Sequence, residues 1–213
     1  CERVRHTDGM RDLLESPDAY IARGQILKDG NSSTVALVEV DGQQVVVKRY
    51  NLKGVWHAFR RAMRKSRAWN CWLNAYRLEF LGIPALRPIA MIERRWGPLR
   101  MEAYFVTEYV PGPDIQAFLR DNDVNGEIEA IVKILSELRL ERISHGDLKA
   151  TNFIVSSSGP VIIDLDGMRE HGSDVTFSRA FDQDIDRFLK NWTDAPDIHA
   201  QVGNLMQQSG LRE

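Results

Sequence analysis

One segment of the chain points most strongly to a fold: His145-Gly-Asp-Leu-Lys-Ala-Thr-Asn152, followed shortly by Val161-Ile-Ile-Asp-Leu-Asp-Gly167. It supplies a carboxylate at Asp147, an amide five residues later at Asn152, and a second carboxylate, Asp164, after a β-branched run. Phosphoryl transfer from a metal-bound nucleotide needs such a set, because its transition state demands positioning and charge neutralisation more than covalent chemistry. We expect Asp147 to face the attacking hydroxyl, and Asn152 and Asp164 to offer the hard oxygens that Mg²⁺ prefers.

The same residues also have a purely structural interpretation. In it, Asp147 and Asn152 are turn residues and Asp164 caps a hairpin, which are common roles for Asp and Asn. A lone Asp-Leu or Asp-Gly pair fits that role, whereas the complete ordered set favours a site. We expect His145 to anchor the loop rather than act as a base. Asp166 is either a supporting partner of the metal site or a turn residue.

A second pattern lies upstream. Residues 44–50, Gln-Val-Val-Val-Lys-Arg-Tyr, predict a short β-branched strand with Lys48 near its end. The strand resembles the Val-Ala-Ile-Lys strand of kinases, and Thr107–Gly112 resembles a kinase hinge. Each pattern alone is a common surface feature, but strand Lys, hinge, catalytic loop and metal Asp follow one another here in kinase order. The chain therefore resembles the protein-kinase-like superfamily.

Four segments narrow the resemblance to the bacterial lipopolysaccharide kinase family, which contains Kdo kinases, core heptose kinases and InaA-like relatives. They are 145–153, 164–167, the stretch from Trp72 to Pro84, and 184–192. The similarity spans roughly Ile21 to Trp192, which is most of the chain.

The resemblance implies an α+β, protein-kinase-like fold of two lobes. Residues 1–110 are expected to form a nucleotide-binding small lobe with a five-stranded antiparallel sheet, and residues 111–213 a short, mainly helical large lobe with the catalytic loop and metal site. The break Pro111-Gly-Pro113 separates them. The expected small-lobe strands are 21–28, 34–40, 44–50, 86–93 and 101–109, with a helical segment at 55–81. In the large lobe, Asp114 and Asn125 are expected helix caps, and strands 153–155 and 161–163 a hairpin around 157–160.

The resemblance also implies ATP and Mg²⁺ as cofactors and assigns roles to individual residues. The catalytic residues are Asp147 and Lys149, with Lys149 contacting the γ-phosphate. Asn152 and Asp164 bind the metal. The nucleotide is bound by Lys48, Gly30, Ser32, Glu108 and Val110, with Thr107 behind the adenine.

Two positions depart from the superfamily pattern. The phosphate loop, residues 28–34, has one glycine, Gly30, so a simple hairpin turn is an equal alternative to phosphate-binding amides. The acid that usually pairs with the strand Lys is not evident. Either Glu79 serves, or another acid does, or Lys48 lacks a helix partner; the positions nearest by spacing are Cys71 and Asn74.

The expected function is ATP- and Mg²⁺-dependent phosphorylation of a heptose or Kdo hydroxyl of the lipopolysaccharide core. The alternatives are a kinase-like regulatory module with weak or no sugar kinase activity, or a protein kinase. The short large lobe and the lack of an Ala-Pro-Glu segment favour a small-molecule or glycolipid acceptor over a protein.

Composition sets the expected location. A net charge of -2 gives no general attraction to nucleic acid, and two cysteines fit a reducing compartment. We expect a cytoplasmic protein without a transmembrane helix or signal peptide, in peripheral contact with the inner membrane. A segment from Gly42 to Leu78 without Asp or Glu is either a solvated helix or a surface for anionic lipid headgroups or phosphorylated sugars. Its basic residues are Lys48, Arg49, Lys53, Arg60, Arg61, Arg64, Lys65, Arg67 and Arg77. Nucleic-acid binding ranks last, because the chain has no recognisable nucleic-acid-binding module.

Overall fold

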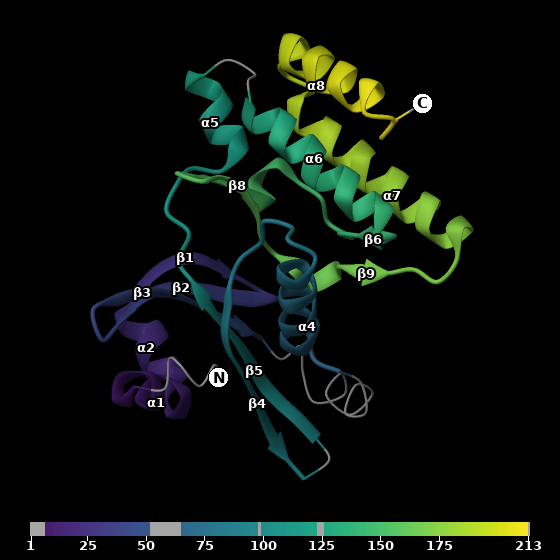
Figure 1. Cartoon of the computed structure of the whole chain (residues 1–213). Coiled ribbons are helices and arrows are strands. Elements are labelled where there is room, and N and C mark those ends of the chain that lie inside the picture. The colour runs from purple at the N-terminus through teal and green to yellow at the C-terminus, as the bar shows by residue number, and fades with distance from the viewer. Residues whose placement is uncertain (1–6, 52–64, 98, 123–125, 213) are drawn as a thin grey trace. The chain divides into compact units, whose positions relative to one another are not determined.

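The computed structural model describes residues 7–51, 65–97, 99–122 and 126–212 of this α+β chain (Figure 1). Its helices are α1 Asp8–Glu15, α2 Pro17–Arg23, α4 Arg67–Phe80, α5 Ile115–Asp121, α6 Gly126–Leu140, α7 Asp174–Leu189 and α8 Pro196–Gln208. Its strands are β1 Gln25–Gly30, β2 Ser33–Val40, β3 Gln43–Tyr50, β4 Pro88–Trp96, β5 Leu99–Glu108, β6 Ile143–Ser144, β7 Phe153–Ser156, β8 Gly159–Ile162 and β9 Arg169–Glu170. The chain forms two compact units: residues 1–76 with 87–109, and residues 77–86 with 110–213.

The first unit contains a five-stranded antiparallel sheet in the order β1-β2-β3-β5-β4, which confirms the predicted sheet. A two-residue turn joins β2 to β3, and its residues Asp41 and Gly42 have φ of 51° and 76°. Positive φ at both positions suits a tight hairpin, because such a turn matches the twist of the strands. The register that follows pairs Val35 with Lys48 and Val47 with Ala36.

One face of this sheet is covered by α1 and α2. Alternate strand residues point into a shared core with the helix residues Leu13, Tyr20 and Ile21. The strand residues of this core are Ala36, Val38, Val40, Val45, Val47, Ile89, Ala90, Tyr104 and Val106. The helices therefore use one face of the sheet, and the opposite residues of each strand belong to the other face.

The expected strand at 21–28 is wrong at its start, because Ile21 ends up in α2. The helix begins with Pro17, a residue suited to a first helical turn, and Asp18 follows it there. The Asp18 carboxylate ties the helix to the sheet: Tyr104 donates to Oδ2 at 2.7 Å, and Arg49 contacts Oδ1 at 3.0 Å. Burial, together with the Asp18 hydrogen bond, raises the pKa of Tyr104.

The other boundaries of the first unit differ by a few residues. The expected strands 86–93 and 101–109 are Pro88–Trp96 and Leu99–Glu108. Within the expected helical segment 55–81, α4 occupies Arg67–Phe80, and residues 55–64 lie outside the described part of the chain. On α4, Cys71 is buried with its Sγ 3.2 Å from the Tyr50 hydroxyl.

The second unit combines helices α5 to α8 with the short hairpin β7–β8 and the two-stranded antiparallel sheet β6–β9. The β7–β8 turn is shorter than expected, because Gly159 already pairs with Ser156. Residues 77–86 join this unit through Ile162, whose N–H donates to the Pro84 carbonyl at 3.1 Å. As expected, Asp114 caps α5 by accepting from the Ala117 N–H at 2.8 Å. The expected cap Asn125 lies outside the described residues.

The Tyr104 hydroxyl holds α2 to the sheet through its hydrogen bond to Asp18. Replacing Tyr104 with Phe removes the hydrogen bond to Asp18 and should lower the free energy of unfolding by about 1 kcal/mol. Chemical denaturation measures this loss. Tyr109→Phe, at a half-buried position, is the matched control and should change stability little. Equal stability of the Tyr104 variant and the parent would contradict the anchoring role.

Candidate active site

The β7–β8 hairpin brings the two predicted metal ligands to one end of the second unit. Phe153 pairs with Ile162, and one step further along, the Ile163 N–H donates to the Asn152 carbonyl at 2.8 Å. Asp164 follows directly. The hairpin therefore places Asn152 and Asp164, twelve residues apart in sequence, on neighbouring strand ends.

Asp164 has an unusual backbone conformation. Its φ and ψ are both 59°, and it begins the 3₁₀ turn Leu165–Gly167. Few residues other than glycine adopt positive φ, although Asp is among those that tolerate it. Such conformations gather at functional sites, where surrounding contacts hold them. Asp166 lies within the same turn.

Asn152 is buried, and its amide is oriented by the loop. Its Nδ2 donates to the Asp147 carbonyl at 2.8 Å. Among the residues that the structure describes, none donates to Oδ1, so this oxygen remains an acceptor for a cation. The same hydrogen bond links the position of Asn152 to that of Asp147.

The Asp147 carboxylate is half-exposed and lies beside two cations. Lys149 Nζ is 2.8 Å from Oδ2, and Arg187 Nη1 is 3.7 Å from Oδ1. The carboxylate, at 46% side-chain exposure, is accessible to solvent. An exposed base with a held orientation is what proton acceptance from a bound hydroxyl requires.

The predicted catalytic loop, residues 145–152, is held from α7 by Asp184, whose side chain is 2% exposed. Its Oδ2 accepts hydrogen bonds from the backbone N–H groups of His145, at 2.7 Å, and Gly146, at 2.9 Å. Arg187, one turn later, lies 3.6 Å from Asp184 Oδ1 and donates to the Gly146 carbonyl at 2.8 Å. Bonds from N–H groups to an ionised carboxylate are stronger than neutral ones.

Sequence reasoning did not find the roles of Asp184 and Arg187. One signal was present: Phe177, Phe181, Asp184 and Phe188 follow a helical period, so the carboxylate lies on the buried stripe of α7. A charge at an apolar position of an amphipathic helix indicates a buried partner.

His145 is a buried anchor, and its tautomer follows from its partners. Nε2 lies 3.1 Å from the Ile163 carbonyl and must donate, while Nδ1 accepts the Asp147 N–H at 3.3 Å. A neutral ring protonated at Nε2 satisfies both. Burial lowers the pKa of His145, against the opposing effects of the Ile163 bond and nearby carboxylates such as Asp184. The ring links the catalytic loop to the strand end before Asp164.

Two glycines allow the loop to approach the turn after Asp164. Gly146 has φ of 82°, and a Cβ there would lie 2.7 Å from the Gly167 carbonyl oxygen. A Cβ at Gly167 would lie 3.0 Å from the His145 carbonyl oxygen. The His-Gly-Asp and Asp-Leu-Asp-Gly motifs thus need glycine where their backbones meet.

In the first unit, Lys48 is half-buried on β3, with Nζ 5.2 Å from the Tyr50 ring centroid. Strand alternation puts Lys48 on the sheet face away from α1 and α2, together with Val46. The register adds Val35 and Leu37, which pair with Lys48 and Val46. These three apolar residues are half-buried. Sequence reasoning missed this apolar platform, although alternation along β2 and β3 indicates it.

The other predicted nucleotide-binding residues lie at the ends of strands. Gly30 ends β1, and Ser32 stands in the turn before β2. Asn51 holds this turn by donating from Nδ2 to the Gly30 carbonyl at 2.9 Å and from its N–H to the Ser32 carbonyl at 3.2 Å. Glu108 ends β5, and Val110 is the first residue of the chain's return to the second unit.

The predicted residues therefore fall into two groups. Lys48, Gly30, Ser32 and Glu108 belong to the first unit. The second unit contains Val110, Asp147, Lys149, Asn152 and Asp164. The contacts around the loop and hairpin bring together the last four.

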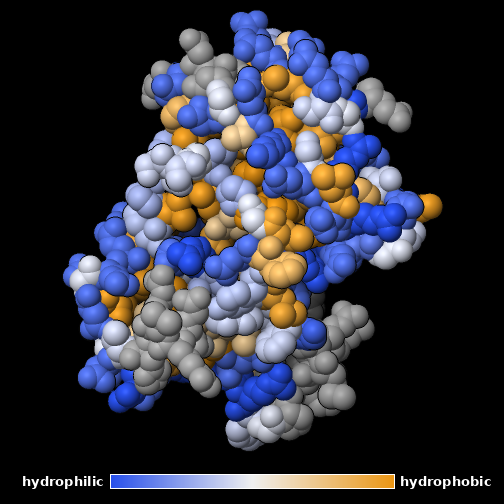
Figure 2. All heavy atoms as spheres, viewed as in Figure 1, coloured by the Kyte–Doolittle hydropathy of each residue, from blue (hydrophilic) through white to orange (hydrophobic). Residues whose placement is uncertain are grey.

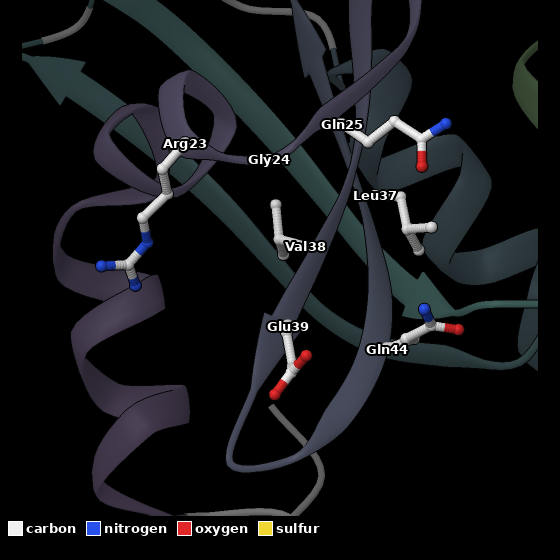
Figure 3. Close-up of a pocket in the computed structure, with 7 residues that line it drawn as sticks. All are labelled: Arg23, Gly24, Gln25, Leu37, Val38, Glu39 and Gln44. Atoms are coloured by element: carbon white, nitrogen blue, oxygen red, sulfur yellow. The ribbon is translucent and has the colours of Figure 1, made fainter.

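A hollow of about 340 Å³ in the first unit lies beside the end of α2 (Figure 3). Its lining residues are Arg23, Gly24, Gln25, Leu37, Val38, Glu39 and Gln44. None of the predicted nucleotide-binding residues lines it, although Leu37 of the apolar platform does.

The chain matches the model of the lipopolysaccharide kinase (Kdo/WaaP) family over residues 19–208 and belongs to that family. It is therefore a kinase, a transferase that uses ATP, and its family acts in lipopolysaccharide biosynthesis. This confirms the resemblance on which the sequence interpretation rested.

A solved structure, WaaP in complex with acyl carrier protein, is similar to this chain, with a TM-score of 0.60 and 20% sequence identity. The similarity covers 100% of this chain and 98% of the WaaP chain, and it shows a shared fold. No curated protein matches the chain in sequence.

No helix within the described residues has the length and apolar character needed to cross a bilayer. The face shown in Figure 2 is mainly hydrophilic, with scattered hydrophobic patches.

The buried neutral His145 predicts how stability depends on pH. Its folded pKa lies below the unfolded value of about 6.5, so between the two the unfolded chain binds a proton that the folded chain does not. The contribution of neutral His145 to the free energy of unfolding is therefore fully present above pH 6.5. It falls as the pH drops below that value, by up to about 1.4 kcal/mol per pH unit.

Denaturation of the parent and of His145→Gln at several pH values between 7.5 and 5 tests this prediction. The glutamine can still donate to the Ile163 carbonyl but does not titrate, so its stability should fall less steeply in acid. His199→Gln, on α8, is the control and should keep the parental slope. Identical slopes for all three proteins would rule out His145 as the source.

Proposed function

We propose that this kinase transfers the γ-phosphoryl group of ATP, with Mg²⁺, to a heptose or Kdo hydroxyl of the lipopolysaccharide core. The observation that carries the proposal is the half-exposed Asp147 carboxylate, held on a loop beside the Asn152–Asp164 hairpin end. The family match gives the acceptor class.

In this proposal the two units act as the small and large lobes expected at 1–110 and 111–213, except that 77–86 groups with the second unit. Lys48 holds the α- and β-phosphates. The Gly30 and Ser32 N–H groups approach the phosphates, and the Glu108 carbonyl and Val110 N–H meet the adenine edge. The apolar platform of Val35, Leu37 and Val46 supplies a surface for the base.

The oxygen donors of the second unit fit Mg²⁺. Asn152 Oδ1 and the Asp164 carboxylate would hold the ion, which neutralises phosphate charge when bound. Among the described residues, no group of three or more His, Cys, Asp or Glu has the geometry of a metal site. That suits an ion held by one or two protein oxygens, because Mg²⁺ in nucleotide sites completes its shell with phosphates and water.

In the transfer step, the sugar hydroxyl oxygen forms a bond to the γ-phosphorus as the bond to the β–γ bridging oxygen breaks. ADP carries away that bond's electron pair, and the hydroxyl proton goes to Asp147. Lys149 Nζ, which lies 2.8 Å from Asp147 Oδ2, leaves this carboxylate and binds the γ-phosphate. The exchange leaves Asp147 Oδ2 open to the hydroxyl.

A second candidate is a kinase-like module of weak activity. One observation on α4 favours it, because the superfamily usually pairs the strand lysine with an acid. The one acid of this helix is Glu79, exposed near its end, while the mid-helix residues Cys71 and Asn74 are buried. Phosphate transfer assays with Kdo-lipid A, core oligosaccharides and generic protein substrates separate the candidates. Transfer to the protein substrates alone, or to none of them, would contradict the sugar kinase proposal.

The roles of the two acids predict different defects. Asp147→Asn should remove most turnover, by about 10²–10⁴-fold, and preserve nucleotide binding, because it alters the group that faces the acceptor. Asp164→Asn should weaken Mg²⁺-nucleotide binding as well, because the ion links the protein to the phosphates. Calorimetry and a transfer assay measure the two effects. Equal nucleotide affinity in both variants and the parent would count against these assignments.

We also propose that the chain works at the cytoplasmic face of the inner membrane, where a lipid-linked acceptor lies. The support is the basic segment 42–78. Its described residues Lys65 and Arg67 are exposed, whereas Arg60, Arg61 and Arg64 lie outside the described residues. Each basic side chain near an anionic surface contributes about 1 kcal/mol of attraction.

Replacing Arg60, Arg61 and Arg64 with Gln should therefore reduce sedimentation with anionic vesicles at low salt. It should raise KM for a lipid-linked acceptor and leave ATP hydrolysis unchanged. Neutral vesicles serve as the control. Undiminished binding to anionic vesicles would show that the segment is only a solvated helix.

A further inference from the structure

Arg187 connects three parts of the candidate site. Its Nη1 donates to the Gly146 carbonyl at 2.8 Å and lies 3.6 Å from Asp184 Oδ1 and 3.7 Å from Asp147 Oδ1. It therefore contacts the carboxylate that clamps the loop, the loop backbone, and the carboxylate that faces the acceptor. The Arg187 side chain is 39% exposed, and the loop residues it touches are 41 and 40 positions earlier in sequence.

The two cations beside Asp147 differ in how they are supported. Lys149 is on the same loop as Asp147 and reaches it through a long exposed side chain. Arg187 rises from α7, between Asp186 and the fully buried Phe188, so its backbone is fixed by core packing. The lysine can leave its partner at little cost, because an exposed ion pair contributes little. The arginine is held by three partners at once.

We propose that Arg187 is a positioning residue, which keeps Asp147 Oδ1 in place while Lys149 moves to the γ-phosphate. This inference rests on the proposed function. When Lys149 moves to the γ-phosphate, Asp147 Oδ2 becomes available to the acceptor hydroxyl. Arg187 is then the remaining cation that orients the carboxylate. It does so from α7, the helix whose Asp184 sets the loop backbone. The base and the loop are thus aligned by the same rigid element.

Guanidinium geometry suits this task. Its planar fork of five N–H donors can serve a carbonyl and two carboxylates together, whereas a lysine ammonium is a point charge on a flexible stem. Lysine at this position should therefore restore the charge but not the full alignment. A small displacement of a catalytic group can cost about 10²-fold in rate.

The experiment compares Arg187→Ala and Arg187→Lys with Arg179→Ala, an exposed arginine of the same helix. We expect kcat to fall about 10²-fold in Arg187→Ala with KM for ATP unchanged, and to fall less in Arg187→Lys. Arg179→Ala should match the parent. Added guanidinium ion should recover part of the activity of Arg187→Ala, an effect that a purely structural defect would not show.

Two kinetic outcomes overturn the inference. One is an unchanged kcat in Arg187→Ala when the parent is active. The other is a loss that appears in KM for ATP rather than in kcat and resists guanidinium. Hydrogen exchange of residues 145–149 tests the contact without turnover: it should quicken in Arg187→Ala alone, and unchanged exchange there would also overturn the inference. A parent that transfers phosphate to no sugar acceptor contradicts the proposed function instead.

Discussion

The candidate site depends on the buried carboxylate of Asp184, which accepts the backbone N–H groups of His145 and Gly146. A buried ionised carboxylate is destabilising unless its oxygens are satisfied, so the loop must adopt the conformation that supplies those two N–H groups. Arg187 offsets the remaining charge and bonds the Gly146 carbonyl. Once these two residues are placed, the direction of the chain into Asp147 is largely determined.

The β7–β8 hairpin holds the same loop from the side opposite to α7. His145 donates from Nε2 to the Ile163 carbonyl, and Asn152 bonds both Ile163 and Asp147 through backbone and amide groups. The loop is therefore held between α7 and the strand end that precedes Asp164. Rigid support on both sides is what a site needs to keep a base and metal oxygens in productive geometry. The half-exposed carboxylate of Asp147 is the group that this frame leaves accessible.

The first unit follows a simpler rule, in which α1 and α2 cover one face of the sheet. Because α1 and α2 bury alternate residues of β2 and β3, the intervening residues Lys48 and Val46 remain half-buried on the opposite face. Strand alternation in the sequence indicated this division. The helical state of Ile21 was not evident from the sequence, because its apolar and polar neighbours fit a short strand equally well. Docking of Asp18 onto Tyr104 and Arg49 decides it.

Most strands of the five-stranded sheet and the motif order that led to the kinase family could be predicted from the sequence, because these depend on local periodicity and on residues at short spacing. The sequence also brought Asp147, Asn152 and Asp164 forward as the chemical residues. The contacts that hold these residues in place come from the tertiary structure. The clamp from Asp184 to Gly146 spans 38 positions and the contact of Arg187 with Gly146 spans 41. No local pattern specifies such pairs, since they form only when α7 packs beside the catalytic loop and an otherwise costly buried charge finds its donors.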